Sequence, residues 1–281
     1  MTAGFVVLTY NRSEALLAVL RALAPQCAAG DSVVVADDGS RPEHVQALRT
    51  GLPRFACPVR HVWHPDVGFT AARSRNLGAL HADRDYVVFL DGDCVPSPHF
   101  VAAHRALAQD RCFVNGSRVL LDAALSRRVE AGEVDAASLG AGDWLRLRMA
   151  GHINKLAHLV RWDGAPGRLQ RRFRWKGIRS ANFGAWMRDL RAVNGFDESF
   201  SGWGHEDADL VLRLHHAGVM RKNGYLATEV FHLWHAEHAR DSEAHNRRRV
   251  EERMRCGTVR ADVGLAEAAA GPAPTVTELN R

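Results

Sequence analysis

Short apolar runs rich in β-branched residues alternate with amphipathic stretches over the first third of the chain. The runs with the composition of buried strands are residues 4–9, 32–36, 59–63 and 86–90. Helices are expected between them: one with helical apolar spacing is capped by Ser13, one begins near Glu43, and one covers residues 71–81. Strands that alternate with helices form βαβ units. The pattern therefore predicts an α/β fold with a Rossmann-like, mostly parallel sheet flanked by helices.

Polar side chains cluster directly after three of these four predicted strands. They are Thr9, Tyr10, Asn11 and Arg12, then residues 37–40, and finally Asp91, Gly92 and Asp93. In open sheets of this class, ligands bind at the carboxyl ends of the strands. The pattern therefore predicts a binding site at this edge before any motif is considered.

The alternation becomes less regular after about residue 115. The elements expected there are a helical region at 120–149, a basic loop at 161–176, a helix at 206–217, a short apolar run at 230–234 and a charged helix at 237–255. The tail, residues 261–281, is rich in alanine and contains two prolines. We expect this tail to be flexible.

The chain has 281 residues, of which 46% are hydrophobic and 25% charged, an ordinary globular composition. No apolar run approaches the roughly 20 residues that span a bilayer, and the first ten residues lack the features of a signal peptide. We therefore expect a cytoplasmic protein that can touch the inner face of a membrane peripherally. Five scattered cysteines without C-x-x-C spacing indicate neither a disulfide framework nor a thiolate metal site.

Much of the net charge of +5 lies in two basic stretches, residues 168–179 and 247–260. A basic balance suits polyanionic partners such as nucleotides, nucleic acids and anionic lipids, although a solvated surface explains these stretches equally well. Few aromatic residues accompany them and no zinc-finger spacing occurs. We therefore expect no nucleic-acid partner.

The fourth predicted strand ends in Asp91-Gly92-Asp93. A bound nucleotide diphosphate must be neutralised, and Mg²⁺ or Mn²⁺ does so with few protein oxygen ligands. A turn at Gly92 would let one carboxylate bind such a metal while the other holds a sugar or ribose. An isolated D-G-D is also a common turn, but its position at a strand end favours the functional interpretation.

Four blocks of the sequence, in this order, resemble glycosyltransferase family 2. They are residues 6–12 (VVLTYNR), 34–40 (VVADDGS), 68–78 (GFTAARSRNLG) and 89–93 (FLDGD). A later block, residues 202–210 (GWGHEDADL), is similar to the C-terminal motif of β-galactosyltransferases and bacterial chondroitin-type polymerases. The resemblance reaches from residue 4 to about 240, leaving the middle insertion and the tail uncovered. It implies a GT-A fold, a single nucleotide-binding α/β domain.

The resemblance also implies roles for the matching positions. The nucleotide-sugar-binding residues would be Thr9, Tyr10, Asn11, Arg12, Asp38, Arg75, Asp91, Gly92, Trp203 and Gly204. Of these, Thr9 and Asp38 would contact the base, and Trp203 would form part of the acceptor or sugar platform. Asp93 would bind Mn²⁺ or Mg²⁺, and the catalytic residues would be Asp207, as the base, and Glu206 directly before it.

The chemistry of transfer independently favours Asp207 as the base. Inverting transfer needs a base on the acceptor hydroxyl while a metal stabilises the leaving diphosphate. An adjacent acid, Glu206, would raise the pKa of Asp207. The alternative is a plain acidic first turn that favours the helix dipole.

Three histidines recur at intervals of three residues: His232, His235 and His238. Imidazoles at this spacing can hold a transition metal. In galactosyltransferase-like enzymes a late histidine segment supplies metal ligands, which by resemblance makes His235 a ligand and His232 a second ligand or pocket wall. His238 has no assigned role. A hydrolytic zinc site is the rival interpretation, but no H-E-x-x-H pattern occurs.

We predict one GT-A domain over residues 1–260, with a nucleotide-binding half (1–115), an acceptor-binding half (116–260) and a C-terminal helical extension. Its predicted activity is inverting, metal-dependent transfer of a hexose or N-acetylhexosamine from a nucleotide diphosphate sugar, UDP by resemblance. The acceptor would be a glycan or lipid-linked hydroxyl in polysaccharide biosynthesis. The alternative is a nucleotide-sugar-binding protein without transfer activity. A nucleotidyltransferase would need a Gly-rich basic loop after the first strand, which residues 9–12 do not form.

Overall fold

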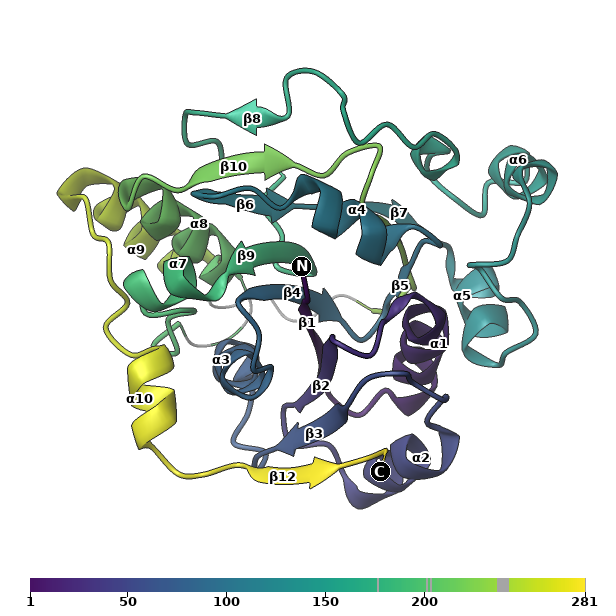
Figure 1. The fold of residues 1–281 in the computed structure, drawn as a ribbon, viewed down its shortest axis with the longest axis horizontal. Coiled ribbons are helices and arrows are strands. Elements are labelled where there is room, and N and C mark those ends of the chain that lie inside the picture. The colour runs from purple at the N-terminus through teal and green to yellow at the C-terminus, as the bar shows by residue number, and fades with distance from the viewer. Residues whose placement is uncertain (176, 201, 203, 237–242, 281) are drawn as a thin grey trace.

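The computed structural model describes residues 1–281 except 176, 201, 203, 237–242 and 281. Its main sheet has nine strands in the order β12-β3-β2-β1-β4-β9-β6-β10-β8, and a smaller sheet has the order β5-β11-β7 (Figure 1). The strands are β1 (Gly4–Thr9), β2 (Ser32–Asp37), β3 (Val59–Trp63), β4 (Tyr86–Asp91), β5 (Cys94–Pro96), β6 (Cys112–Asn115), β7 (Ser117–Leu120), β8 (Leu169–Gln170), β9 (Asn182–Trp186), β10 (Met220–Asn223), β11 (Glu229–His232) and β12 (Thr275–Glu278).

The four strands predicted from the first third of the chain form the centre of the main sheet and run parallel to one another. Thr9 pairs with Asp37 and Leu8 with Asp91, so the polar residues that follow these strands meet at one edge. Beyond β4 the sheet becomes mixed, because β9 is antiparallel to both β4 and β6. The expected α/β class is confirmed.

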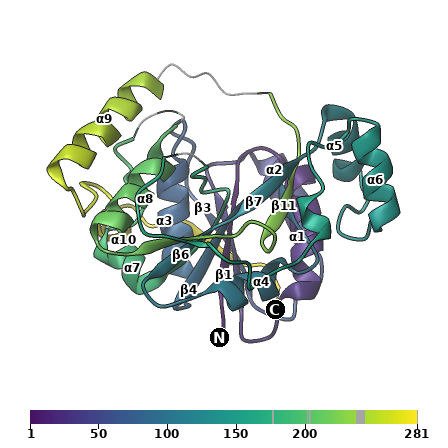
Figure 2. The same cartoon turned by 90° about the horizontal axis from the view of Figure 1, so that it is seen from above.

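Helices cover both faces of the main sheet (Figures 1 and 2). The helices are α1 (Ser13–Leu23), α2 (Pro42–Gly51), α3 (Ala71–His81), α4 (Phe100–Leu107), α5 (Ala123–Glu130), α6 (Ala141–Met149), α7 (Met187–Ala192), α8 (Glu206–His216), α9 (Glu243–Cys256) and α10 (Leu265–Ala270). On one face, Phe5 and Val7 pack with apolar residues of α1 and α4, and on the other Val6 packs with those of α3, α7 and α8. This alternation is the period-two pattern of a buried strand. No helix in the described part of the chain is long and apolar enough to cross a membrane.

Two local expectations were wrong. Residues 120–149 are not one helical region, because α5 ends before Gly132, which has a φ of +76°, and a separate helix, α6, follows. Ser13 does not cap α1 but is its first residue. The Ser13 hydroxyl lies 3.0 Å from Nδ1 of His44 on α2 instead.

The tail is also more ordered than its composition suggested. Within residues 261–280 the chain forms α10 and then β12, which pairs antiparallel with β3 along the edge of the main sheet. The Asn280 side chain holds the C-terminal end of the chain against β3. It accepts a 2.7 Å hydrogen bond from the Val59 amide and donates one of 2.8 Å to the Cys57 carbonyl. The expectation of a flexible tail is therefore corrected, since the open edge of β3 provides a partner for the alternating segment TVTE.

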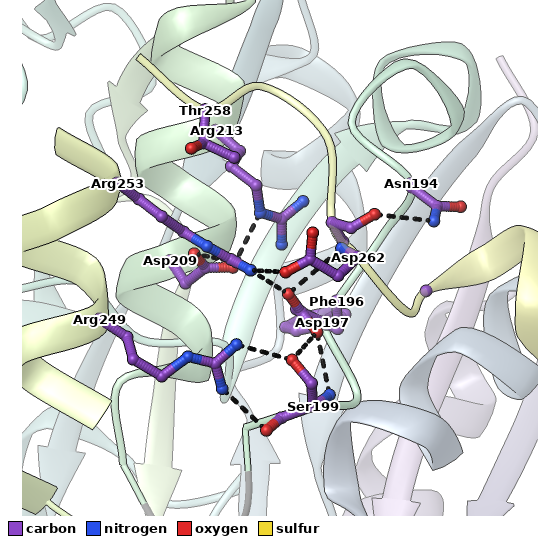
Figure 3. A network of polar contacts seen from close by, with 12 residues as sticks. Asn194, Phe196, Asp197, Ser199, Asp209, Arg213, Arg249, Arg253, Thr258 and Asp262 are labelled. Atoms are coloured by element: carbon purple, nitrogen blue, oxygen red, sulfur yellow. Dashed lines mark hydrogen bonds and ion pairs between the residues drawn. The ribbon is translucent and has the colours of Figure 1, made fainter. Parts of the chain in front are cut away.

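A buried ionic network fixes α8 against α9 (Figure 3). Arg253 of α9 donates hydrogen bonds to Asp209 (2.7 Å) and to Asp197 (2.6 Å). Asp209 also accepts a 2.8 Å bond from Arg213, one turn further along α8. Asp197, Asp209 and Arg213 are fully buried, so each charge depends on the others for compensation. The network holds the first turn of α8 in place, where the predicted base lies.

Candidate active site

A cavity of about 840 Å³ opens at the carboxyl ends of the central strands. Most of the predicted site residues line it: Thr9, Tyr10, Arg12, Asp38, Arg75, Asp91, Gly92, Asp93, Gly204, Glu206, Asp207 and His235. Their convergence follows from the parallel register of β1, β2 and β4 and from the position of α8. The cavity therefore lies where the strand-end pattern predicted a binding site.

Gly92 brings the two carboxylates of the D-G-D turn close to β1. Its amide donates a 2.7 Å hydrogen bond to the Leu8 carbonyl, and a Cβ at this position would lie only 2.6 Å from that oxygen. Any larger residue would push the turn away from β1. Glycine therefore allows Asp91 and Asp93 to flank the end of this strand.

Asn11 and Asp38 mainly organise the site's framework. Asn11 has a φ of +50°, its amide donates to the Ser40 hydroxyl, and its side chain accepts a 2.8 Å bond from the Arg41 amide. It does not line the cavity. Asp38 lines it, but its carboxylate already accepts hydrogen bonds from the Ser74 hydroxyl (2.9 Å) and from Thr70 at the start of α3. Asp38 thus holds the start of α3 at the cavity wall.

Arg75 connects the D-G-D turn to the start of α8. It is only 4% exposed, and its Nη2 donates a 2.9 Å bond to Asp91. Its Nη1 lies 3.5 Å from a carboxylate oxygen of Glu206. The guanidinium therefore couples the two acidic segments of the cavity and compensates the charge of Glu206.

Asp207 is the carboxylate best suited to accept a proton. The chain turns into α8 through two residues in the left-handed region, Gly204 (φ +111°) and His205 (φ +72°), which places Asp207 in the first turn. Burial, followed by the charge of Glu206, raises the pKa of Asp207 to about 7, while Arg75 and Arg179 oppose the shift. A carboxylate with this pKa exchanges protons near neutral pH.

The residues around Asp93 form a candidate metal centre. Its carboxylate lies 3.9 Å from Nε2 of His232 and 3.4 Å from Nε2 of His235. Asp93 Oδ2 also lies 2.9 Å from the guanidinium of Arg12. The thiol of Cys94, which the cysteine spacing did not indicate as a metal ligand, belongs to the same cluster, since Asp93, Cys94 and His232 offer ligand atoms within 4.8 Å of one another. Carboxylate and imidazole groups suit divalent transition metals, so the donor set fits such an ion.

Two residues singled out in the sequence lie outside the described residues: Trp203, predicted as part of the acceptor or sugar platform, and His238, which had no assigned role. The first six positions of the charged helix expected at 237–255 lie outside them as well. His232 does not line the cavity, but its Nε2 lies 3.9 Å from the Asp93 carboxylate and its side chain is only 14% exposed. Sequence reasoning missed Arg118, Trp175 and Arg179, which do line the cavity. The basic stretch at 168–179 was the signal for two of them, but nothing local indicated that it folds over the site.

Comparison with known proteins agrees with these observations. Residues 5–158 match the family model described as glycosyl transferase family 2, and residues 167–238 match the one described as the N-terminal domain of galactosyltransferase. The chain is 30% identical over 226 residues to validoxylamine A glucosyltransferase of Streptomyces hygroscopicus subsp. limoneus, covering 76% of this chain and 48% of that protein. It is 29% identical to chondroitin synthase of Escherichia coli, covering 76% and 32%. The chain thus spans about half or less of the length of the curated relatives it matches.

Solved structures share the fold at low sequence identity. Staphylococcus aureus TarS 1–349 in complex with UDP-GlcNAc has a TM-score of 0.57 at 13% identity, with coverage of 95% of this chain and 69% of that one. GalNAc-T7 with UDP, GalNAc and Mn²⁺ has a TM-score of 0.56 at 15% identity, with coverage of 90% and 48%. These likenesses confirm the GT-A fold that the motifs implied.

Proposed function

Because the chain belongs to glycosyltransferase family 2, we propose that it is an inverting, metal-dependent enzyme that transfers a hexose or N-acetylhexosamine from a UDP-sugar. The acceptor would be a hydroxyl of a glycan or lipid-linked glycan. The observation that carries this proposal is that Asp207, Asp93 and His235 line the same cavity. A base for the acceptor and a centre for the diphosphate are the two parts that such a reaction requires.

Asp207 would start the transfer by taking the proton of the acceptor hydroxyl on a carboxylate oxygen. The acceptor oxygen then bonds to the anomeric carbon as the bond from that carbon to the diphosphate oxygen breaks, and the bonding electrons leave with the diphosphate. A single displacement of this kind inverts the anomeric configuration. Glu206 would not be the base itself, because it is ion-paired with Arg75, but its charge favours the proton on Asp207.

Asp93, His232 and His235 would hold Mn²⁺ or Mg²⁺, with the Cys94 thiol beside them. When bound, the ion would neutralise the diphosphate and stabilise it as a leaving group. Arg12 already touches Asp93. With the ion bound, the Arg12 guanidinium would contact either the diphosphate or the Asp93 carboxylate.

The remaining wall of the cavity would bind the nucleotide and the sugars. Thr9, Tyr10 and Asp38 lie at the ends of β1 and β2 and would receive the base, while Asp91 would face the ribose or donor sugar. UDP and UDP-GlcNAc are the ligands in two of the TarS structures, and UDP with Mn²⁺ is present in GalNAc-T7, which supports the choice of nucleotide. The names of two relatives, chondroitin synthase of Escherichia coli and hyaluronan synthase of Pasteurella multocida, support a polysaccharide acceptor. We further propose that the transfer takes place in the cytoplasm or at the inner face of a membrane.

A panel of nucleotide sugars with Mn²⁺ tests this proposal. Wild-type protein should hydrolyse one UDP-sugar slowly and transfer its sugar to an acceptor, with inverted configuration visible by NMR of the product. Asp207→Asn should bind the donor unchanged but lose about a hundred- to ten-thousand-fold in turnover. Donor binding without hydrolysis or transfer in the wild type would instead favour a non-catalytic binding protein. A retained configuration would exclude the single displacement.

A further inference from the structure

A second cavity, of about 460 Å³, adjoins the first. It is bounded by β7 of the small sheet and by β8 and β10, which form one edge of the main sheet (Figure 1). Arg118, Gly177 and Arg179 line both cavities, so the two lie side by side at these residues. The charge of Arg179 also acts on Asp207. The second cavity therefore begins beside the proposed base.

The described lining of this cavity is strongly basic. It contains five cationic side chains and no carboxylate: Arg118, Lys155, Arg174, Arg179 and Arg221. Neither Arg118 nor Arg179 forms an ion pair with a carboxylate in the part of the chain that the structure describes. The charge of one carboxylate, Glu229, acts on Lys155. Glu229 is buried outside the cavity lining, and its carboxylate accepts a hydrogen bond from the Leu226 amide. The positive charges of Arg118 and Arg179 therefore face the cavity without an ion pair among the described residues.

The cationic groups are also held close together by the fold. Arg221 on β10 is 9% exposed and donates a 2.8 Å bond to the Gly177 carbonyl, which fixes the loop that carries Arg174. The Lys155 ammonium donates a 2.6 Å bond to the Ser117 hydroxyl on β7. Burial, and then the neighbouring cations, lower the pKa values of Arg179 and Arg221. Like charges held together in a partly desolvated site are stabilised by an oxyanion that accepts their hydrogen bonds.

We propose that the acceptor is itself anionic, and that its carboxylate or phosphate group binds between Arg118, Lys155 and Arg174 while its reacting hydroxyl lies at Asp207. This inference rests on the proposed function, since it places an acceptor in the larger cavity. The donor diphosphate does not explain the basic lining, because Lys155 and Arg174 line only the second cavity. The oxyanion would orient the acceptor by bonds that a neutral sugar cannot make.

Binding of three sugars with the same ring tests the inference: D-glucuronate, D-glucose 6-phosphate and D-glucose. Each would be titrated calorimetrically into the protein saturated with UDP and Mn²⁺, so that the diphosphate position is filled. We expect at least one of the two anionic sugars to bind about tenfold or more tightly than glucose, as charge-assisted hydrogen bonds require. Comparison of the carboxylate with the phosphate identifies the kind of oxyanion.

Matched variants show whether the cavity is responsible. Lys155→Met and Arg174→Gln should each lower the affinity for the anionic sugar about tenfold and leave the UDP affinity unchanged. Lys222→Met and Arg171→Gln remove the same charges from outside the cavity lining and should leave both affinities unchanged. Equal binding of glucose and both anions, no binding of either anion, or equal losses in the control variants would overturn the inference.

Failure of the proposed function would look different. Donor hydrolysis is measured without any acceptor, so a protein that hydrolyses a UDP-sugar but shows no preference for anionic sugars would retain the proposed function and lose only this inference. A protein that binds the anions but neither hydrolyses nor transfers any sugar would lose the proposed function. In that case the cavity would remain an anion site without an acceptor role.

Discussion

Nη1 of Arg12 lies 2.9 Å from Oδ2 of Asp93, the carboxylate that we propose as a metal ligand. The same guanidinium contacts Glu130 of α5 at 2.7 Å through Nη2. Arg12 is therefore held between two carboxylates at the cavity rim, and a cation that binds Asp93 must compete with it. This competition makes the role of Asp93 measurable in the absence of nucleotide.

Arg12→Met should tighten Mn²⁺ binding to the nucleotide-free protein by up to about fivefold, the size expected for a partly exposed ion pair. The same change should weaken UDP-sugar binding, because the cation beside the diphosphate is lost. Calorimetry with Mn²⁺ alone and then with the UDP-sugar separates the two effects. Arg21→Met, at an exposed position on α1, serves as the control. Unchanged Mn²⁺ affinity in Arg12→Met would mean that the ion does not use Asp93.

If the metal centre is assigned correctly, substitutions of its proposed ligands should reduce the Mn²⁺ dependence of donor binding to different extents. Asp93→Ala should abolish the Mn²⁺ dependence of donor binding, and His235→Ala and His232→Ala should each weaken it, because both imidazoles approach that carboxylate. Asp85→Ala, exposed at the opposite end of β4, and His99→Ala, exposed before α4, are matched controls. Donor affinity would be measured with Mn²⁺ and with EDTA.

Two outcomes would contradict this assignment. If Asp93→Ala binds the donor equally well with Mn²⁺ and with EDTA, and as tightly as the wild type, the ion is bound elsewhere or not needed. If elemental analysis of purified protein finds stoichiometric zinc that survives dialysis, the histidines belong to a different kind of centre, as the rival interpretation of this segment proposed.

The ionic network behind α8 should matter for both stability and activity. Arg253→Met leaves Asp197 and Asp209 buried without their shared cation, which costs about 3–5 kcal/mol and should lower Tm by more than about 6 °C. Because the network fixes the first turn of α8, turnover at temperatures below Tm should fall more than donor affinity. Arg255→Met, exposed two residues later, should change neither. A stable, fully active Arg253→Met protein would show that α8 is positioned by apolar packing alone.

The core of the fold and the location of the site were predictable because their signals are local. The strands β1 and β3 and the helix α3 have the predicted bounds, and each was predicted from the residues of its own segment. Residues at the ends of parallel strands must meet once the strands pair in register. Asp91, Asp93 and Thr9 could therefore be placed in one site without knowledge of any distant contact.

The features that the sequence did not reveal depend on pairings between distant segments. β12 pairs with β3, which lies about two hundred residues earlier in the chain. Composition alone does not reveal this partner, so the Ala-rich tail with its two prolines was predicted to be flexible. The basic cavity is assembled from β7, β8 and β10, and Lys222 on β10 pairs with Leu169 on β8. In the sequence, Arg118 and Lys155 are isolated cations, and only the fold places them beside the basic stretch at 168–179.

The raised pKa of Asp207 predicts how activity depends on pH. As a base it must be unprotonated, so kcat/KM should rise about tenfold per pH unit below about 7 and level off above that value. Asp207→Asn should remain poorly active at every pH and lack this limb. A wild-type profile that is flat between pH 5 and 8 would remove Asp207 from the base role.

The same shift predicts how stability depends on pH. The carboxyl of Asp207 has a pKa of about 7 in the folded protein, above its ordinary value of 3.8, because burial and Glu206 disfavour the charged form. Between these two values the folded state binds the extra proton, so this group's contribution to the free energy of unfolding falls as pH rises, and the loss is complete above pH 7. Asp207→Asn removes that charge, so its Tm should exceed that of the wild type by more at pH 8 than at pH 5. Asp85→Asn, at an exposed position, should show no such difference. A Tm gain for Asp207→Asn that is equal at both pH values would mean that this carboxyl is not held protonated by the fold.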